Sequence, residues 1–410
     1  MTFKSGISKK NKFAILTRNK KPKNWLYIYI YSSPQKDHVN LVQELSTFSS
    51  NTRVIHFSRF DLELENHLSW KILLKKRYFF KSLNNIHELI NIKYCNWKFI
   101  DIIPMQRFKL SKLINSKLKI IIFKILAIFF KTRIVVIYNF PTQSIQKFVT
   151  KLKPFATIAD CTEYWTKSNC ILSKKMATVT ISNNYQAEKN LQKYSKTSRV
   201  SAGYFTDKTI DSLYRKTAAM RAMPRTIAYL GSIDWRLDYD SIKYAMRTLS
   251  DFSFIFFSDE LFSYDYEHQS LDLRKKNAKA KREFEKIKTF SNFSYIPTKN
   301  HKDVISNLFT CSAGIIPYKI NTKFYQNTHP VKQYFYLSAG IPIVASKFKM
   351  ITNSEPFIRT YENKEEFVKQ ILQSSKRVLT PIERKEIFLK CKKQTIKIKA
   401  LHIQSILYEI

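Results

Sequence analysis

Short apolar runs alternate with segments of helical spacing along this chain, and the alternation starts twice. The apolar runs before about residue 205 cover 25–31, 53–57, 133–138 and 155–159, and those after it cover 226–230, 252–257, 293–296, 313–317 and 343–345. The segments between them, such as 41–48 and 142–152, carry apolar residues at helical spacing. Strands that alternate with helices favour a parallel sheet. We therefore expect an α/β chain with two Rossmann-like parallel-sheet domains.

The length supports this division, because 410 residues with 44% hydrophobic content can bury two cores. We expect a basic N-terminal arm over 1–24, a first domain over 25–205, a second over 206–380 and a C-terminal helix over 381–410. The charged segment 274–288 is typical of a solvated helix.

The charge balance is strongly basic, with 71 Lys and Arg against 31 Asp and Glu and a formal net charge of +40. Such a chain attracts polyanions, which include nucleic acid, anionic lipid headgroups and nucleotide phosphates. Part of the excess is also what an AT-rich genome produces, since Lys, Asn and Ile are abundant and only 5 residues are Gly. The basic residues are dispersed and no RRM, KH, helix-turn-helix or zinc signature occurs, so no nucleic-acid partner is expected.

Cysteine usage and the apolar segments bear on location. The 5 cysteines are odd in number and form no CxxC pair, which favours a reducing cytosol. The segment 118–130 is interrupted by Lys119 and Lys124 and is shorter than the ~20 residues that span a bilayer. It either lies on an anionic membrane surface, helped by the basic arm, or is a buried helix with solvated lysines.

Two segments of the second half suit an anionic ligand. The run 227–230 leads into Gly231, and such a turn exposes backbone N–H groups to which Arg236 adds charged donors. Further on, the loop 319–330 places His329 and Lys332 near the start of a helix, where peptide N–H groups near Val331 also point at an anion.

Four stretches together resemble the nucleotide-sugar half of group 1 GT-B glycosyltransferases, with matching order and spacing. They are YLGSIDWRLDYD (229–240), SNFSYIPTKNHKDV (291–304), GIIPYK (314–319) and PVKQYFYLSAGIPIV (330–344). The pattern Pro-x-Lys-x-x-x-Tyr particularly resembles the xanthan-pathway glucuronosyltransferase and related polysaccharide-biosynthesis transferases. The resemblance covers roughly 155–375 and implies two domains facing a cleft.

What the resemblance implies for the site is a donor pocket in the second domain. The nucleotide-sugar candidates are Gly231, Ser232, Asp234, Arg236, Tyr318, His329, Val331, Lys332 and Gln333. Many members of this family carry a glutamate that binds the nucleotide ribose, whereas this chain has Phe335 at that position. The glucuronosyltransferase branch also lacks that glutamate.

In the first domain, the stretch 158–165 resembles the acidic strand-end motif of the same family. An inverting transferase needs a carboxylate here to take the proton of the acceptor hydroxyl, which makes Asp160 and Glu163 the catalytic candidates. Alternatively, Asp160 caps the next helix or pairs with a lysine. No metal or other cofactor is expected, because Asp238 and Asp240 follow a glycine turn with helical continuation and basic residues can neutralise a leaving diphosphate.

The resemblance thus implies a bacterial glycosyltransferase that moves a sugar from a nucleotide-sugar, such as a UDP-sugar, to a lipid-linked or saccharide acceptor in cell-surface polysaccharide biosynthesis. It would work in the cytoplasm at the inner face of the plasma membrane. Two alternatives are a GT-B scaffold that has lost catalysis, for which Phe335 is the main support, and a basic nucleic-acid-binding protein.

Overall fold

The computed structural model describes part of the chain in each half. The described residues are 25–31, 41, 44–45, 53–58, 94–96, 120–128, 131–161, 165, 167–183, 188–189, 191–200, 203, 206–217, 225–258, 271–297, 304, 307–319, 330–347, 351 and 357–410. The expected basic arm, 1–24, lies outside them.

The chain divides into two compact units. Unit 1 contains residues 1–203 and returns at the end of the chain with residues 396–410, and unit 2 contains residues 204–395. Each unit holds one sheet, and every strand pairing printed for the two sheets is parallel. The expected α/β fold with two parallel-sheet domains is therefore confirmed.

The sheet of unit 1 has the strand order β3-β2-β1-β4-β5-β6-β7. Its strands are β1 (Trp25–Tyr31), β2 (Arg53–Ser58), β3 (Tyr94–Asn96), β4 (Arg133–Tyr138), β5 (Ala156–Cys161), β6 (Val179–Ser182) and β7 (Thr197–Arg199). Its labelled helices are α7 (Gln143–Leu152), α8 (Lys167–Lys174) and α17 (Ile396–Glu409), and residues 120–128 are also helical.

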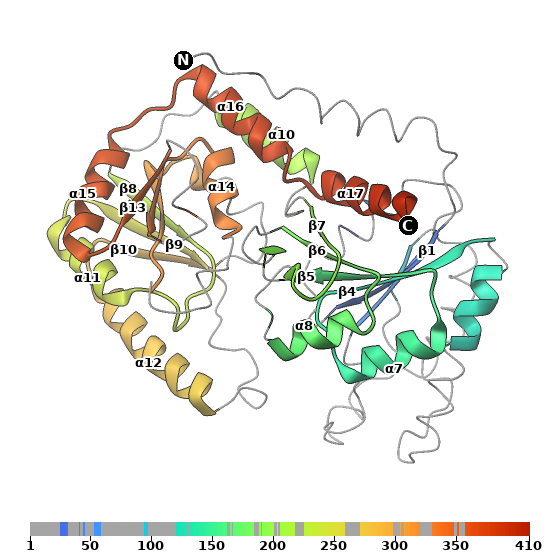
Figure 1. The fold of residues 1–410 in the computed structure, drawn as a ribbon. Coiled ribbons are helices and arrows are strands. Elements are labelled where there is room, and N and C mark those ends of the chain that lie inside the picture. The colour runs from blue at the N-terminus through green and yellow to red at the C-terminus, as the bar shows by residue number, and fades with distance from the viewer. Residues whose placement is uncertain are drawn as a thin grey trace, which may run out of the picture. The chain divides into compact units, whose positions relative to one another are not determined.

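Both faces of this sheet are covered, because side chains that alternate along each strand enter two separate cores. One core joins Leu26 and Ile28 of β1 to Phe148 of α7, and the other joins Tyr27 of β1 to Ile403 of α17. Figure 1 shows α17 over one face of the sheet and α7 and α8 over the other. The strands β1 and β4 are therefore nearly continuous apolar runs in the sequence.

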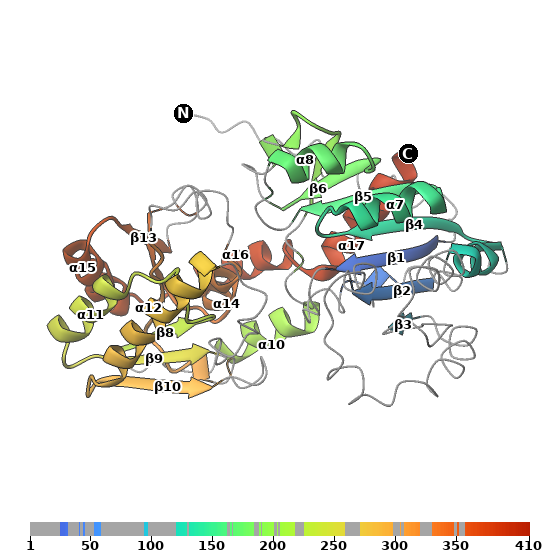
Figure 2. The same ribbon diagram turned by 90° about the horizontal axis from the view of Figure 1, so that it is seen from below.

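The sheet of unit 2 has the strand order β10-β9-β8-β11-β12-β13. Its strands are β8 (Thr226–Leu230), β9 (Ser253–Ser258), β10 (Phe293–Pro297), β11 (Ala313–Ile316), β12 (Ile343–Ser346) and β13 (Ile358–Tyr361). Its labelled helices are α10 (Asp207–Thr217), α11 (Tyr239–Thr248), α12 (Leu271–Lys288), α14 (Lys332–Ser338), α15 (Lys364–Ser375) and α16 (Pro381–Lys392). Figure 2 shows β8, β9 and β10 side by side with α12 against them.

The helices of unit 2 form two packed groups around one hydrophobic core. Helix α11 packs against α12 and α15, whereas α16 packs against α10 and α14. Strands β8 and β11 are neighbours in the middle of the sheet, so the loops at their carboxyl ends lie close together. Ligands of open α/β sheets bind outside this edge.

The end of the chain differs from the single helix expected over 381–410. Helix α16 ends at Lys392 and belongs to unit 2, and α17 begins at Ile396 and belongs to unit 1. The edge strands β3, β7 and β13, which have 3, 3 and 4 residues, are also absent from the strands that the sequence predicts.

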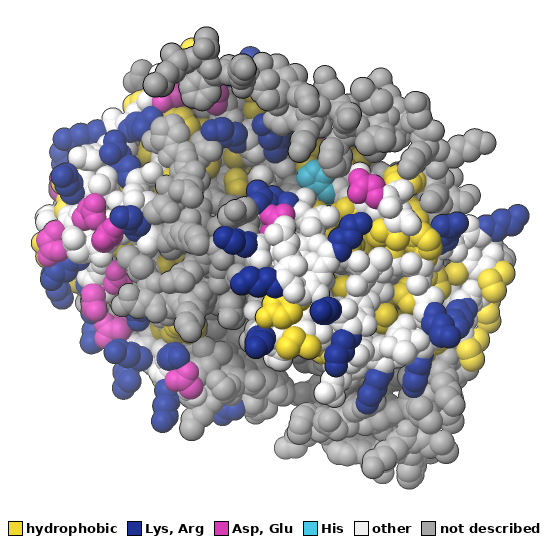
Figure 3. All heavy atoms as spheres, in the orientation of Figure 1, with side chains coloured by type: hydrophobic (Ala, Val, Ile, Leu, Met, Phe, Trp, Pro, Cys, Tyr) yellow, Lys and Arg dark blue, Asp and Glu magenta, His cyan; other side chains and the backbone are white. Residues whose placement is uncertain are grey.

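The basic side chains are spread over the surface. In the view of Figure 3, Lys and Arg side chains are scattered over the described surface and acidic side chains lie among many of them. Within the described residues, no helix is long and apolar enough to cross a bilayer.

Candidate functional site

The turn after β8 depends on a glycine. Gly231 has φ +121°, a backbone conformation that side chains with a Cβ rarely adopt. A Cβ added there would lie 3.0 Å from the Nζ of Lys332 and 3.2 Å from its Cε. The backbone of the turn and the ammonium of Lys332 are therefore in close approach, although about 100 residues separate them in the sequence.

Lys332, the first residue of α14, is buried between two tyrosines. Only 8% of the residue is exposed. Its Nζ donates a hydrogen bond to the Tyr229 hydroxyl at 3.1 Å, and lies 4.3 Å from the centroid of the Tyr229 ring and 4.7 Å from that of Tyr318. Electron-rich ring faces attract a cation, so the two rings hold the ammonium at the glycine turn.

This cation has no carboxylate partner among the described residues. Burial is the main cause that lowers the pKa of Lys332, because desolvation disfavours the charged form. Burial likewise raises the pKa of Tyr229 well above its usual value, so its hydroxyl stays protonated and donates to the Ser232 carbonyl at 2.5 Å. An anion at the turn would supply the missing countercharge and stabilise the ammonium.

A second cation of the turn is neutralised locally. The Arg236 Nε lies 2.8 Å from both carboxylate oxygens of Asp234, and the Arg236 backbone N–H donates to the same carboxylate at 2.9 Å. Side-chain exposure is 27% for Arg236 and 17% for Asp234. The pair is fixed in a forked geometry, so Arg236 brings less net charge to the turn than the sequence suggests.

Hydrogen bonds tie this loop to the segment after β11. Leu237 and Tyr318 form an isolated antiparallel bridge, and the Asp238 backbone N–H donates to the Pro317 carbonyl at 2.8 Å. The Asp238 side chain also caps α11 by accepting from the Ser241 backbone N–H at 3.2 Å. The loop that carries Gly231 is thereby held beside Tyr318.

Tyr336 of α14 fixes the helix against the strands. Its hydroxyl accepts a hydrogen bond from the Leu230 backbone N–H at 2.7 Å, and the Ala228 and Ile315 carbonyls lie 3.2 Å from it. The ring packs on Gly314, where a Cβ would lie 2.5 Å from the ring atoms. Lys332, one helical turn earlier, is positioned by the same packing.

The remaining donor-site candidates differ in their location and burial. Val331 occupies the N-cap position of α14 without a side-chain cap, and Gln333 is 2% exposed. Phe335 is buried in the core of unit 2, so the position at which relatives carry a ribose-binding glutamate is apolar and faces the core here. His329 lies outside the described residues.

The carboxylate predicted to be a catalytic base is placed differently. Asp160 lies inside β5 and is 1% exposed, and its Oδ2 is 2.7 Å from the Nζ of Lys399 of α17. The Tyr29 hydroxyl is 3.5 Å from the same oxygen. The alternative that Asp160 pairs with a lysine describes this geometry, and its role as a catalytic base stays a prediction. Glu163 lies outside the described residues.

No group of three or more His, Cys, Asp or Glu side chains gathers within the described part of the chain. Asp238 is the cap of α11, and Asp240 pairs with Lys243 at 3.1 Å. The expectation that the reaction needs no metal stays a prediction.

Two residues of these sites were missed in the sequence analysis. Tyr229 lies in an apolar strand and looks like an ordinary core residue. Lys399, in contrast, lies on the same helical face as Ile396, Ala400 and Ile403, and a lysine on an apolar face is a signal of a buried partner.

Comparison with solved structures supports the fold over nearly the whole chain. Sucrose-phosphate synthase from Thermosynechococcus elongatus matches with a TM-score of 0.60 and 11% identity over 94% of this chain and 99% of that one. Anabaena HepE in complex with UDP matches with a TM-score of 0.59 and 10% identity over 94% and 100%. A UDP-forming α,α-trehalose-phosphate synthase from Burkholderia vietnamiensis matches with a TM-score of 0.57 and 8% identity over 95% and 100%.

No protein-family model and no curated protein sequence matches this chain. At 8–12% identity the solved structures show that the chain has the two-domain α/β fold of the GT-B class.

Proposed function

We propose that this protein is a glycosyltransferase whose donor is a nucleotide-sugar bound at the glycine turn of unit 2. The observation that carries the proposal is the buried ammonium of Lys332, which two tyrosine rings hold against Gly231 and which forms no ion pair with a described carboxylate. Retaining such a cation costs folding free energy, which a bound anion would offset. The site lies at the carboxyl edge of the sheet, where α/β folds bind nucleotides.

In this proposal the site stabilises the leaving group of the reaction. The bond between the anomeric carbon of the sugar and the diphosphate oxygen breaks, and a bond from that carbon to the acceptor hydroxyl oxygen forms, while the hydroxyl proton passes to a base or to the departing diphosphate. Negative charge develops on the departing diphosphate, and the Lys332 ammonium is preorganised to stabilise it in a poorly solvated site. The Asp234–Arg236 pair fixes the loop that positions the diphosphate.

A UDP-sugar is the donor class that we favour. The solved structures that share the fold include a UDP complex, a UDP-glucose complex and a UDP-forming synthase. An acidic sugar such as glucuronate would suit the basic chain, whereas the burial of Phe335 means that ribose recognition must use groups other than a glutamate at that position.

The acceptor belongs to the first domain in this proposal. A lipid-linked or saccharide acceptor of bacterial surface-polysaccharide synthesis would reach the protein at the inner face of the plasma membrane. The net charge of +40 and the helix 120–128, on which Ile121, Ile125 and Ile128 are 50%, 58% and 78% exposed, support contact with an anionic lipid surface. If the reaction inverts the anomeric centre, Glu163 is the candidate that remains for the base.

Two observations favour a second candidate, a scaffold that binds nucleotide without turnover. Phe335 packs in the core where relatives carry a ribose-binding carboxylate, and Asp160 is occupied by Lys399. The two candidates share the donor site and differ in catalysis.

A screen of UDP-, GDP-, dTDP- and CMP-sugars tests the proposal. Thermal stabilisation by one nucleotide class, with release of the nucleoside diphosphate, is the expected result, because a ligand at 100 times its Kd adds about 2.7 kcal/mol of stability. Stabilisation without release would favour the scaffold, and no stabilisation by any nucleotide would contradict both candidates.

A further inference from the structure

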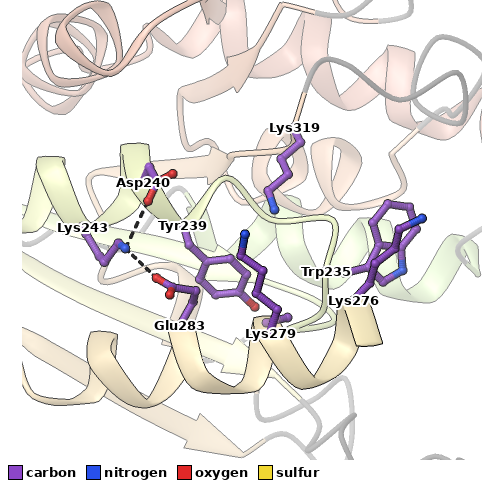
Figure 4. A pocket seen from close by; sticks show the side chains of 9 residues that line it. Trp235, Tyr239, Asp240, Lys243, Lys276, Lys279, Glu283 and Lys319 are labelled. Carbon is purple, nitrogen blue, oxygen red and sulfur yellow. Dashed lines mark hydrogen bonds and ion pairs between the residues drawn. The ribbon is translucent and has the colours of Figure 1, made fainter. Parts of the chain in front are cut away.

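A cavity of about 480 Å³ lies in unit 2, between the loop after β8 and the helices α11 and α12 (Figure 4). This volume is in the range of small-molecule sites, roughly 300–1,000 Å³. Its lining includes Trp235 from the loop, Tyr239 from α11, Lys279 from α12 and Lys319 after β11. The Lys332 site is not part of this lining.

One end of the cavity is electrically neutral and rigid. Lys243 lies 3.1 Å from Asp240 and 2.5 Å from Glu283, and Glu283 is also 2.9 Å from Lys286. Hydrogen bonds from Lys243 and Lys286 lower the pKa of Glu283 to about 2, so the carboxylate is ionised at neutral pH. Two cations and two anions balance there, and Figure 4 shows Lys243 turned toward both of its partners.

The middle of the cavity, between Tyr239 and Trp235, carries excess positive charge (Figure 4). Lys279 and Lys319 form no ion pair with a described carboxylate, and Figure 4 shows both side chains extending into the cavity. Lys276 pairs with Asp272 at 2.6 Å, but both side chains are half exposed or more, so that pair is weak. Lys279 and Lys319 would therefore favour a ligand that carries an anionic group.

Aromatic side chains lie on both sides of Lys279 and Lys319, with Tyr239 on the side of Lys243 and Trp235 on the opposite side (Figure 4). Trp235 and Tyr239 contribute ring surface, Ala280 contributes a small apolar floor, and the Lys276 ammonium lies 5.5 Å from the Trp235 ring centroid. Flat aromatic surface in a pocket suits the apolar face of a ring-bearing ligand, with a few polar groups to orient it.

We propose that this cavity binds a sugar that carries a phosphate or a carboxylate. The anion lies between Lys279 and Lys319, and the sugar ring packs against Trp235. The proposal rests on the cavity alone and not on nucleotide-sugar transfer at Lys332, although the loop 231–238 and the segment after β11 contribute residues to both sites.

Calorimetric titration of the full chain tests it with four probes, which are glucose 6-phosphate, glucuronate, neutral glucose and inorganic phosphate. Lys279→Ala is compared with Lys281→Ala, which removes the same charge from an exposed position of α12 outside the cavity lining. UDP is titrated in parallel with each protein. A charge-assisted contact is worth about 1.5–3 kcal/mol, which corresponds to at least about a tenfold change in Kd.

We expect at least one charged sugar to bind, Lys279→Ala to weaken it about tenfold or more, and Lys281→Ala to leave it within about twofold. Tighter binding of glucose 6-phosphate would identify the phosphate as the anionic group that the cavity prefers, and tighter binding of glucuronate would identify the carboxylate. The proposal is overturned if no charged sugar binds, if Lys279→Ala has no effect, or if inorganic phosphate binds as tightly as the sugars. UDP binding in the absence of charged-sugar binding would overturn this proposal and leave the proposed function intact.

Discussion

The ammonium of Lys399 lies 2.7 Å from the carboxylate of Asp160, and both side chains are almost completely buried, with 5% and 1% exposure. The two residues are 239 positions apart, so the pair fastens the last helix of the chain to the sheet of unit 1. Side chains on both sides of Lys399 along α17 enter the same core. A charge pair thus sits within an otherwise apolar helix–sheet contact.

Lys399→Met should destabilise the protein by about 3–5 kcal/mol, because it leaves the Asp160 carboxylate buried without a countercharge. Chemical denaturation measures this loss. The double variant Asp160→Leu/Lys399→Met should recover much of it, since an apolar pair of similar size removes the unpaired charge.

A cost below about 1 kcal/mol for Lys399→Met would be that of an exposed pair and would contradict the buried geometry. A catalytic role for Asp160 makes a different prediction, in which Asp160→Asn abolishes turnover while stability is unchanged.

The fold could be predicted from the sequence because buried parallel strands leave a simple pattern. Strand β8 and the start of α11 lie at the predicted residues, since an apolar run, a glycine and a helix cap follow one another there. The edge strand β13 was missed because three of its four residues are only partly buried and its sequence, IRTY, has no continuous apolar run. The division of the last 30 residues between two units depends on tertiary packing and has no local signal.

Residues of the site could be predicted only where the spacing of sequence motifs indicates them. Gly231 and Lys332 were identified, and they meet in the structure. The surroundings of Lys332 were not predictable, because a tyrosine in a buried strand looks the same whether its hydroxyl holds an ammonium, as Tyr229 does, or packs in the core. The partner of Asp160 was not predictable, because a sequence does not show that a lysine 239 residues away reaches the same strand.

Gly231→Ala should lower stability by about 1–3 kcal/mol and abolish nucleotide binding, because the new Cβ is strained at φ +121° and meets the Lys332 ammonium. Gly340→Ala is the matched control, since Gly340 has φ +69° at the end of α14. That control should lose about 1 kcal/mol and keep nucleotide binding. Equal loss of binding in both variants, measured by calorimetry, would contradict a special role for the Gly231 turn.

Stability should depend on pH through Lys332. Burial lowers its pKa in the folded protein below the ordinary 10.5, so between the lowered pKa and 10.5 the unfolded chain binds more protons and stability rises with pH. Lys332→Met lacks this contribution and should be more stable than the wild type below that window, with the difference shrinking as the pH rises. Urea denaturation of both proteins from about pH 7 to pH 10 measures the difference. A constant difference would show that the ammonium is not desolvated.

Removal of divalent metal should leave nucleotide binding unchanged. The described residues offer Lys332 as the charge at the turn and no cluster of metal ligands. Titration of UDP in the presence and absence of EDTA tests this expectation. A Kd that rises about tenfold or more with EDTA would require a metal in the donor site.

The central claim is that the buried Lys332 ammonium binds the diphosphate of the donor, and UDP titration of Lys332→Met against Lys364→Met tests it most directly. Lys364 is a fair control, because its ammonium also lies over a tyrosine ring, 4.9 Å from the centroid of Tyr244, but is half exposed on α15. The account predicts that Lys332→Met stays folded and loses UDP affinity by at least about a hundredfold, whereas Lys364→Met stays within about twofold of the wild type. Equal UDP affinity of Lys332→Met and the wild type would contradict the account.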